Sequence, residues 1–167
     1  MMSERRTFRE GVRVGLIAYA TVAIFYSGFD LLAARGTLFT VDMLGKAVFR
    51  GLRDPAVLLF PQQLDLAAIF WYNGLHLIAS LVIGVIVTLL VAHAERHPTR
   101  ARVLALAVFT GGALTVLTIG TLTEGMRSVL PWWSIIVANV LAAILAGFYL
   151  LARTGARAAL LGTWRHA

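Results

Sequence analysis

The sequence contains no cysteine. This absence excludes disulfide bonds, thiolate metal sites and thiol redox chemistry within the chain, and with them the enzymes of disulfide exchange. Charge is also scarce, because only 14% of the residues are Asp, Glu, Lys or Arg, about half the proportion in an ordinary soluble domain. The apolar residues that take their place have to lie in lipid.

Common catalytic motifs are missing as well. The sequence has no serine in a Gly-x-Ser-x-Gly turn, no His-Glu-x-x-His zinc motif and no glycine-rich phosphate loop. We therefore expect no catalytic residues, no protein-bound metal site and no enzyme activity of the chain's own, which leaves open a place within an enzyme complex.

Apolar side chains are abundant, at 59% of the residues. A helix needs roughly 20 apolar residues to cross a hydrocarbon core of about 30 Å, and four segments are long enough. They cover about residues 14–34, 66–92, 103–124 and 132–152. The sequence thus predicts an all-α integral membrane protein, with four transmembrane helices in an antiparallel bundle and residues 1–167 in a single transmembrane domain.

The charges divide unequally between the two sides of such a bundle. With four spans both termini share a side, and the segments on that side carry ten basic and three acidic residues. The opposite side carries five of each. Because cytoplasmic loops are enriched in Lys and Arg, we expect a multi-pass protein of the cell inner (cytoplasmic) membrane with both termini cytoplasmic. The net charge of +7 is then explained by lipid headgroups as partners, and nucleic acid is not expected.

The connections between the spans differ in length. The links after the second and third spans are short, whereas the first link covers about residues 35–65, too long to be featureless in a compact protein. Within it, about residues 41–53 read as an amphipathic helix that rests at the outer membrane interface. Its expected apolar face consists of Val41, Leu44, Val48 and Leu52, and its polar face of Asp42, Lys46, Arg50 and Arg53, with Asp42 and Lys46 spaced for an i,i+4 ion pair.

Aromatic residues flank the ends of two spans. Trp and Tyr are enriched where a helix leaves the hydrocarbon, so Trp71, Tyr72, Trp132 and Trp133 are predicted to anchor the protein at the interface.

Small and polar residues recur at spacings of three and four within each span. Such residues mark helix contacts in membranes, because they allow backbones to approach. The stripes are Gly15, Tyr19, Ala23, Tyr26 and Asp30; Asn73, His76, Ser80, Gly84 and Thr88; Gly111, Thr115 and Thr118; and Asn139, Ala143 and Ala146. At about 1.5 Å per residue, Tyr26, His76, Thr118 and Asn139 fall at similar depths, so we expect one polar layer in the outer half.

His76 has three competing interpretations, since an ionisable residue at membrane depth is a functional candidate. It could be a neutral imidazole that fixes helix register by hydrogen bonding. It could be an axial ligand to a haem or a chlorophyll-type pigment, although His93 lies about 25 Å further along the same helix and cannot share a metal with it. It could line a quinone or lipid headgroup pocket. The candidate cofactor-binding residues are His76, Tyr26, Asn139 and Thr118, with no cofactor as the default.

The carboxylates near the outer ends are expected to pair with neighbouring cations, Asp30 with Arg35 and Glu124 with Arg127. No ionisable groups continue inward from them, and paired Gly/Pro breaks at mid-span are missing, so a proton-coupled or secondary transporter is disfavoured. The cluster around His93 and His97 is expected to lie in a solvated cytoplasmic loop.

Together these features favour a non-catalytic accessory subunit of a larger bacterial membrane complex, respiratory or photosynthetic, with other integral membrane subunits as partners. A homo-oligomer is also compatible with the sequence. The alternative is an electron-transfer protein that binds haem, pigment or quinone beside His76.

Overall fold

The computed structural model describes residues 4–52, 54 and 63–153. Within these residues the chain is helical and has no strand. The helices are α1 (Glu4–Leu32), α2 (Phe39–Phe49), α4 (Leu66–Arg96), α5 (Ala101–Leu122) and α6 (Trp132–Arg153), with short 3-10 turns η1 (Pro98–Arg100) and η2 (Glu124–Met126). Four of them, α1, α4, α5 and α6, are long and apolar enough to cross a membrane. The predicted multi-pass membrane class is therefore supported.

Helix ends follow local chemistry. Asp65 starts α4, because its side chain accepts a hydrogen bond from the backbone N–H of Ala68 at 2.9 Å. At the other end of α4, His97 precedes Pro98, which cannot continue the hydrogen-bond ladder. The first helix starts at Glu4, ten residues before the predicted start, since the charged segment ahead of the apolar run is also helical.

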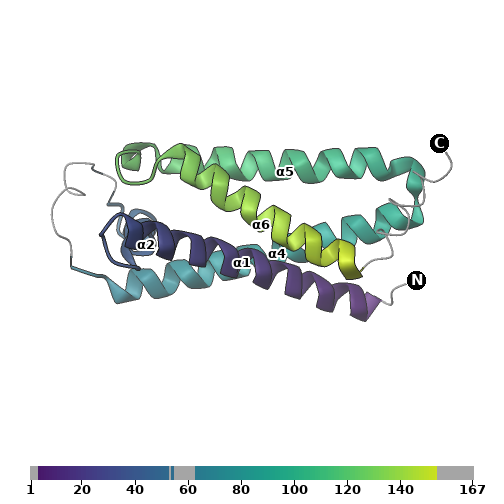
Figure 1. The fold of residues 1–167 in the computed structure, drawn as a ribbon, viewed down its shortest axis with the longest axis horizontal. Coiled ribbons are helices and arrows are strands. Elements are labelled where there is room, and N and C mark those ends of the chain that lie inside the picture. Colours follow the sequence, from purple (N-terminus) through teal and green to yellow (C-terminus); the bar gives the residue numbers. More distant parts are fainter. Residues whose placement is uncertain (1–3, 53, 55–62, 154–167) are drawn as a thin grey trace.

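The long helices lie along the long axis of the molecule (Figure 1). Figure 1 shows α1 and α4 side by side, with α2 near the end of α1 where the first link begins. It also shows α6 starting beside α5 and crossing obliquely towards α1. The beginning of α1 and the end of α6 therefore lie at the same end of the molecule.

Glycine allows the closest contact between α1 and α4. A Cβ atom built on Gly84 would lie 2.6 Å from the carbonyl oxygen of Gly11, and one on Gly15 would lie 2.6 Å from the carbonyl oxygen of Ser80. Real side chains do not tolerate such distances from backbone, so this approach requires glycine. The predicted stripes on these two helices do form a helix contact.

Helix α5 is the least covered span. Only 6% of the residues in its apolar stretch are buried, against 17%, 22% and 28% in α1, α4 and α6. One firm attachment lies near its end, where the Trp132 ring of α6 lies against Gly120. A Cβ atom at Gly120 would lie 2.6 Å from Cζ2 of that ring.

Two small apolar cores hold the remaining elements. The larger, here called the α2 core, joins α2 to the segment before α6 and contains Met43, Leu44, Ala47, Met126, Leu130 and Ile135. The smaller lies near the opposite end, where Val14 of α1 packs with Ala146 and Leu150 of α6.

Candidate functional site

His76 lies between two tyrosine rings where α1 packs on α4. Its ring centroid is 5.3 Å from that of Tyr19 and 6.4 Å from that of Tyr72, whose plane is within 6° of parallel. Tyr19 also donates a hydrogen bond to Oδ1 of Asn73 at 3.0 Å, and Asn73 donates to the carbonyl oxygen of Ile69 at 2.9 Å. We call Tyr19, Tyr72, Asn73 and His76 the tyrosine–histidine cluster.

The Nε2 atom of His76 is buried and has no hydrogen-bond partner among the described residues. A buried polar atom without a partner typically costs about 1–3 kcal/mol. In a membrane span the cost is not relieved by lipid, which cannot hydrogen bond. A hydrogen-bonding ligand of this cluster would therefore bind to this nitrogen.

Axial ligation of a metal would require open space in front of Nε2 of His76. A haem or chlorophyll-type macrocycle would have to approach Nε2 directly, and that atom is enclosed by protein. Both tyrosine rings of the cluster also lie close to the imidazole. Within the described part of the chain, no group of three or more His, Asp or Glu residues could hold a metal ion. The geometry therefore leaves less room at Nε2 for a pigment or haem than for a small hydrogen-bonding group.

The other predicted cofactor-binding residues have no described contact with His76 itself. Tyr26 packs against the α2 core. Asn139 donates to the carbonyl oxygen of Ile135 on its own helix at 2.8 Å, and Thr118 is exposed on α5. The described contacts do not bring these three and His76 into one layer, and their part in cofactor binding stays a prediction.

The predicted aromatic anchors fall into two kinds. Trp71 and Trp133 are 60% and 55% exposed, as an interfacial anchor would be. Tyr72 instead stacks on His76, and Trp132 packs on Gly120 with Arg127 over its ring at 5.5 Å. Neighbouring aromatic residues on a helix point about 100° apart, so one of each pair turns inward. Sequence reasoning therefore missed Tyr72 as a neighbour of His76.

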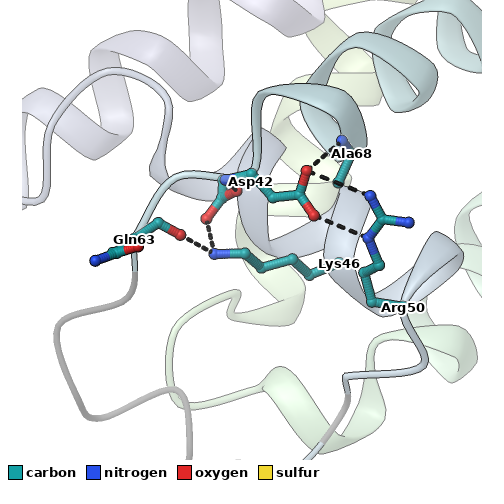
Figure 2. Close-up of polar contacts among 6 residues, drawn as sticks. Asp42, Lys46, Arg50, Gln63 and Ala68 are labelled. Carbon is teal, nitrogen blue, oxygen red and sulfur yellow. Dashed lines mark hydrogen bonds and ion pairs between the residues drawn. The ribbon is translucent and has the colours of Figure 1, made fainter.

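A polar network joins α2 to the start of α4 (Figure 2). Lys46 is buried, with Nζ 2.6 Å from Oδ2 of Asp42, and it also donates to the carbonyl oxygen of Gln63. Oδ1 of Asp42 accepts the backbone N–H of Asp65 at 2.8 Å. The predicted i,i+4 ion pair is thus confirmed, and it also ties α2 to the first turn of α4.

Asp65 completes this network. Besides capping α4, its carboxylate pairs with Nε of Arg50 at 2.8 Å. The hydrogen bond from Arg50 and the backbone N–H of Ala68 lower the pKa of Asp65 to about 2. Asp65 therefore stays charged far below the pH at which an ordinary aspartate is protonated.

The face assignment of α2 was wrong in part. Asp42 and Lys46, assigned to the polar face, are buried, whereas Val48 is 48% exposed. A Cβ atom on Gly45 would lie 2.6 Å from the carbonyl oxygen of Ala68, so the helix approaches α4 through this glycine. That approach turns the adjacent ion pair inward, where the N–H groups at the start of α4 need an acceptor. Arg53 lies outside the described residues.

Asp30 is paired as predicted but is fully enclosed, at 1% exposed. Its carboxylate accepts the backbone N–H and the hydroxyl of Thr40, both at 2.6 Å, and pairs with Arg35 at 3.3 Å. Arg35 lies over the rings of Phe29 and Phe39 and donates to the carbonyl oxygen of Val129 at 2.9 Å. These contacts clamp the end of α1 to the start of α2, so Asp30 has a structural explanation.

Predictions for three further ionisable residues concern Glu124, His93 and His97. Glu124 pairs with Arg127 at 3.3 Å on the surface. His93 and His97 are both exposed, with ring centroids 4.6 Å apart, but His93 belongs to the last turn of α4 and not to the loop.

Comparison with known proteins adds no further constraint. No family model matches the chain, and no curated protein or solved structure matches it significantly.

Proposed function

We propose that the protein is a non-catalytic accessory subunit of a larger membrane protein complex, held by a membrane-embedded helix of another polypeptide that packs on α5. In this proposal the four long helices form an antiparallel bundle in the cell inner membrane. Both termini are cytoplasmic, and α2 lies at the outer interface.

The observation that carries the proposal is the poor coverage of α5. Its buried share is 6%, the lowest of the four spans. Along one side it presents small residues at helical spacing, here called the small-residue face: Ala107, Gly111, Thr115 and Thr118. A Cβ atom on Gly111 would meet no atom within 4 Å. Because helices in lipid associate mainly through close packing of small residues, this face supports a partner helix.

The distribution of ion pairs supports the orientation. At the α2 end each described cation has an acidic partner within 3.3 Å: Arg35 with Asp30, Lys46 with Asp42, Arg50 with Asp65 and Arg127 with Glu124. The opposite end carries an excess of exposed arginine. Unpaired arginine near span ends favours the cytoplasmic side.

Purification from the native membrane in a mild detergent, followed by mass spectrometry, tests the proposal. We expect a partner in constant stoichiometry with the wild-type chain, lost in the variant Gly111→Leu. The matched control is Gly147→Leu on α6, where a Cβ atom also meets nothing within 4 Å, and it should keep the partner. Migration of the wild-type chain alone, as a monomer or homodimer, would contradict the proposal.

A second candidate function rests on the unpaired Nε2 of His76. A quinone carbonyl that reaches this nitrogen would accept a hydrogen bond from it. An absorption spectrum of the purified protein tests the haem and pigment versions, which require a Soret or chlorin band. The quinone version predicts that His76→Leu lowers quinone content without lowering thermal stability, and an unchanged quinone content would exclude it.

A further inference from the structure

A buried acidic residue organises the arginine-rich end of the molecule. Glu10 of α1 is only 3% exposed. Its carboxylate accepts a hydrogen bond from the Tyr149 hydroxyl of α6 and pairs with Arg13 at 3.0 Å. Arg13 also lies 3.3 Å from the Tyr149 hydroxyl. Two helices are thus joined by one carboxylate, one phenol and one guanidinium.

More positive charge surrounds Glu10 than it can neutralise. The guanidinium of Arg153 lies 5.7 Å from the Tyr149 ring centroid, and Arg9, which precedes Glu10, is exposed. Arg13 itself keeps 42% of its side chain exposed. Three guanidiniums around one carboxylate leave a local excess of two positive charges.

Among the described side chains, the rest of this end supplies few anions. In the part of the chain that the structure describes, it carries eight arginines and three glutamates. The side chains described there form one ion pair, Arg13 with Glu10. The α2 end differs, because its described cations are paired. The exposed guanidiniums at this end are therefore available to an external anion.

The depth of the site in the membrane indicates which kind of anion would bind there. Helix α6 has 22 residues, about 33 Å at 1.5 Å per residue, close to the thickness of a hydrocarbon core. Its last residue, Arg153, thus lies at headgroup level. Apolar side chains next to the site are exposed, with Leu145 and Phe148 of α6 at 49% and 64% and Leu16 of α1 at 45%. An acyl chain could lie along them, whereas a free anion would gain nothing from them.

We propose that Arg13 and Arg153, positioned by Glu10 and Tyr149, bind the phosphodiester headgroup of an anionic phospholipid at the arginine-rich end of α1 and α6. Arginine suits this task, because its planar fork can donate two hydrogen bonds to one phosphate. The long side chains can also reach the headgroup while their stems stay in the apolar layer. Arg9, one turn before Arg13 on α1, adds electrostatic attraction for the headgroup. The site requires membrane insertion but does not depend on the accessory-subunit proposal.

Native mass spectrometry of the purified full chain tests the site. The probes are dioleoylphosphatidylglycerol, dioleoylphosphatidylcholine and inorganic phosphate. An arginine near an anionic headgroup is worth about fivefold in affinity, so we expect Arg13→Gln/Arg153→Gln to weaken phosphatidylglycerol binding by about 30-fold. The control Arg100→Gln/Arg102→Gln removes the same charge at the same end and should change binding by less than about twofold.

Several results would overturn the inference. Equal losses in the two double variants would mean a diffuse basic surface without a site. Equal affinity for phosphatidylcholine would remove the role of lipid charge, and equal competition by inorganic phosphate would indicate a free-anion site. The single variant Arg153→Gln changes an exposed residue at a helix end and should fold, so it tests the site if the double variant does not. An unchanged affinity in that variant would also refute it.

Discussion

Individual charged residues hold the α2 end of the molecule together, and Asp65 is the one that joins α2 to α4. It caps α4, pairs with Arg50 and, through its backbone N–H, anchors Asp42. Lys46 is also buried, and it pairs with the Asp42 carboxylate on α2. These charged side chains join α2 to the first turn of α4.

The lowered pKa of Asp65 predicts a pH dependence of stability. The pKa is about 2 in the folded chain, against 3.8 for an unperturbed aspartate. A depressed folded-state pKa stabilises the fold above the unfolded value, and this contribution is lost as pH falls through the folded value. Wild type should thus lose stability between about pH 4 and pH 2 by more than Asp65→Asn does. Thermal unfolding in detergent across this range measures it.

The matched control for that experiment is Glu124→Gln. Glu124 also forms an ion pair with an arginine, but its side chain is 68% exposed, so its removal should leave the pH profile like that of wild type. If Asp65→Asn and wild type keep the same difference in stability from pH 6 to pH 2, Asp65 does not carry the pH dependence.

The Tyr19–Asn73 hydrogen bond gives a second prediction for single residues. Hydrogen bonds between transmembrane helices contribute about 0.6 kcal/mol on average and at most about 1.7. A double-mutant cycle of Tyr19→Phe and Asn73→Leu should return a coupling energy in that range, measured by unfolding in mixed micelles. A coupling of zero would mean that the two side chains do not interact in the folded protein.

At the level of helices, the contact between α1 and α4 depends on glycine, which gives a matched pair of variants. Gly84→Ala would place Cβ 2.6 Å from the carbonyl oxygen of Gly11, so it should destabilise the protein by about 1–3 kcal/mol. Gly74→Ala on the same helix meets nothing within 4 Å. It should be neutral or stabilise by up to about 1 kcal/mol, because alanine favours the helix.

Unfolding in mixed micelles measures both variants under identical conditions. The informative quantity is the difference between them, because helix propensity is common to both substitutions. Equal effects of Gly84→Ala and Gly74→Ala would contradict the close approach of α1 and α4.

The spans were predictable because long apolar runs leave few alternatives. The positions of Gly15, Gly84 and Ser80 on the α1 and α4 contact were also predictable, because small residues at spacings of three and four share a helix face. The polar face of α2 was not. Helical spacing alone assigned Asp42 and Lys46 to a polar face, whereas the close contact of Gly45 with α4 and the backbone N–H groups at the start of α4 turn them inward.

The surroundings of His76 could be predicted only in part. Depth along each helix does not predict which side chains contact His76, because depth contains no information on rotation about the helix axis. Tyr19 and Tyr72 are its neighbours, whereas Thr118 sits on the weakly packed α5. Such contacts depend on how the helices cross.

For the whole molecule, the absence of cysteine makes the proposed orientation easy to test. Single thiols can be introduced at Ser128, in the exposed link before α6, and at Thr99, in the exposed link after α4. A membrane-impermeant maleimide applied to intact spheroplasts should label Ser128→Cys. It should label Thr99→Cys only after the membrane is permeabilised. The reverse pattern would invert the proposed topology.

Site-specific photo-crosslinking in the native membrane shows directly whether a helix of another polypeptide covers α5. A photoreactive amino acid would replace Leu114, 56% exposed and one turn from Gly111, or Ile24 on α1, 72% exposed. We expect one discrete protein adduct from position 114, lost when Gly111→Leu is added, and lipid adducts alone from position 24. Lipid adducts alone from both positions would contradict the proposed partner helix.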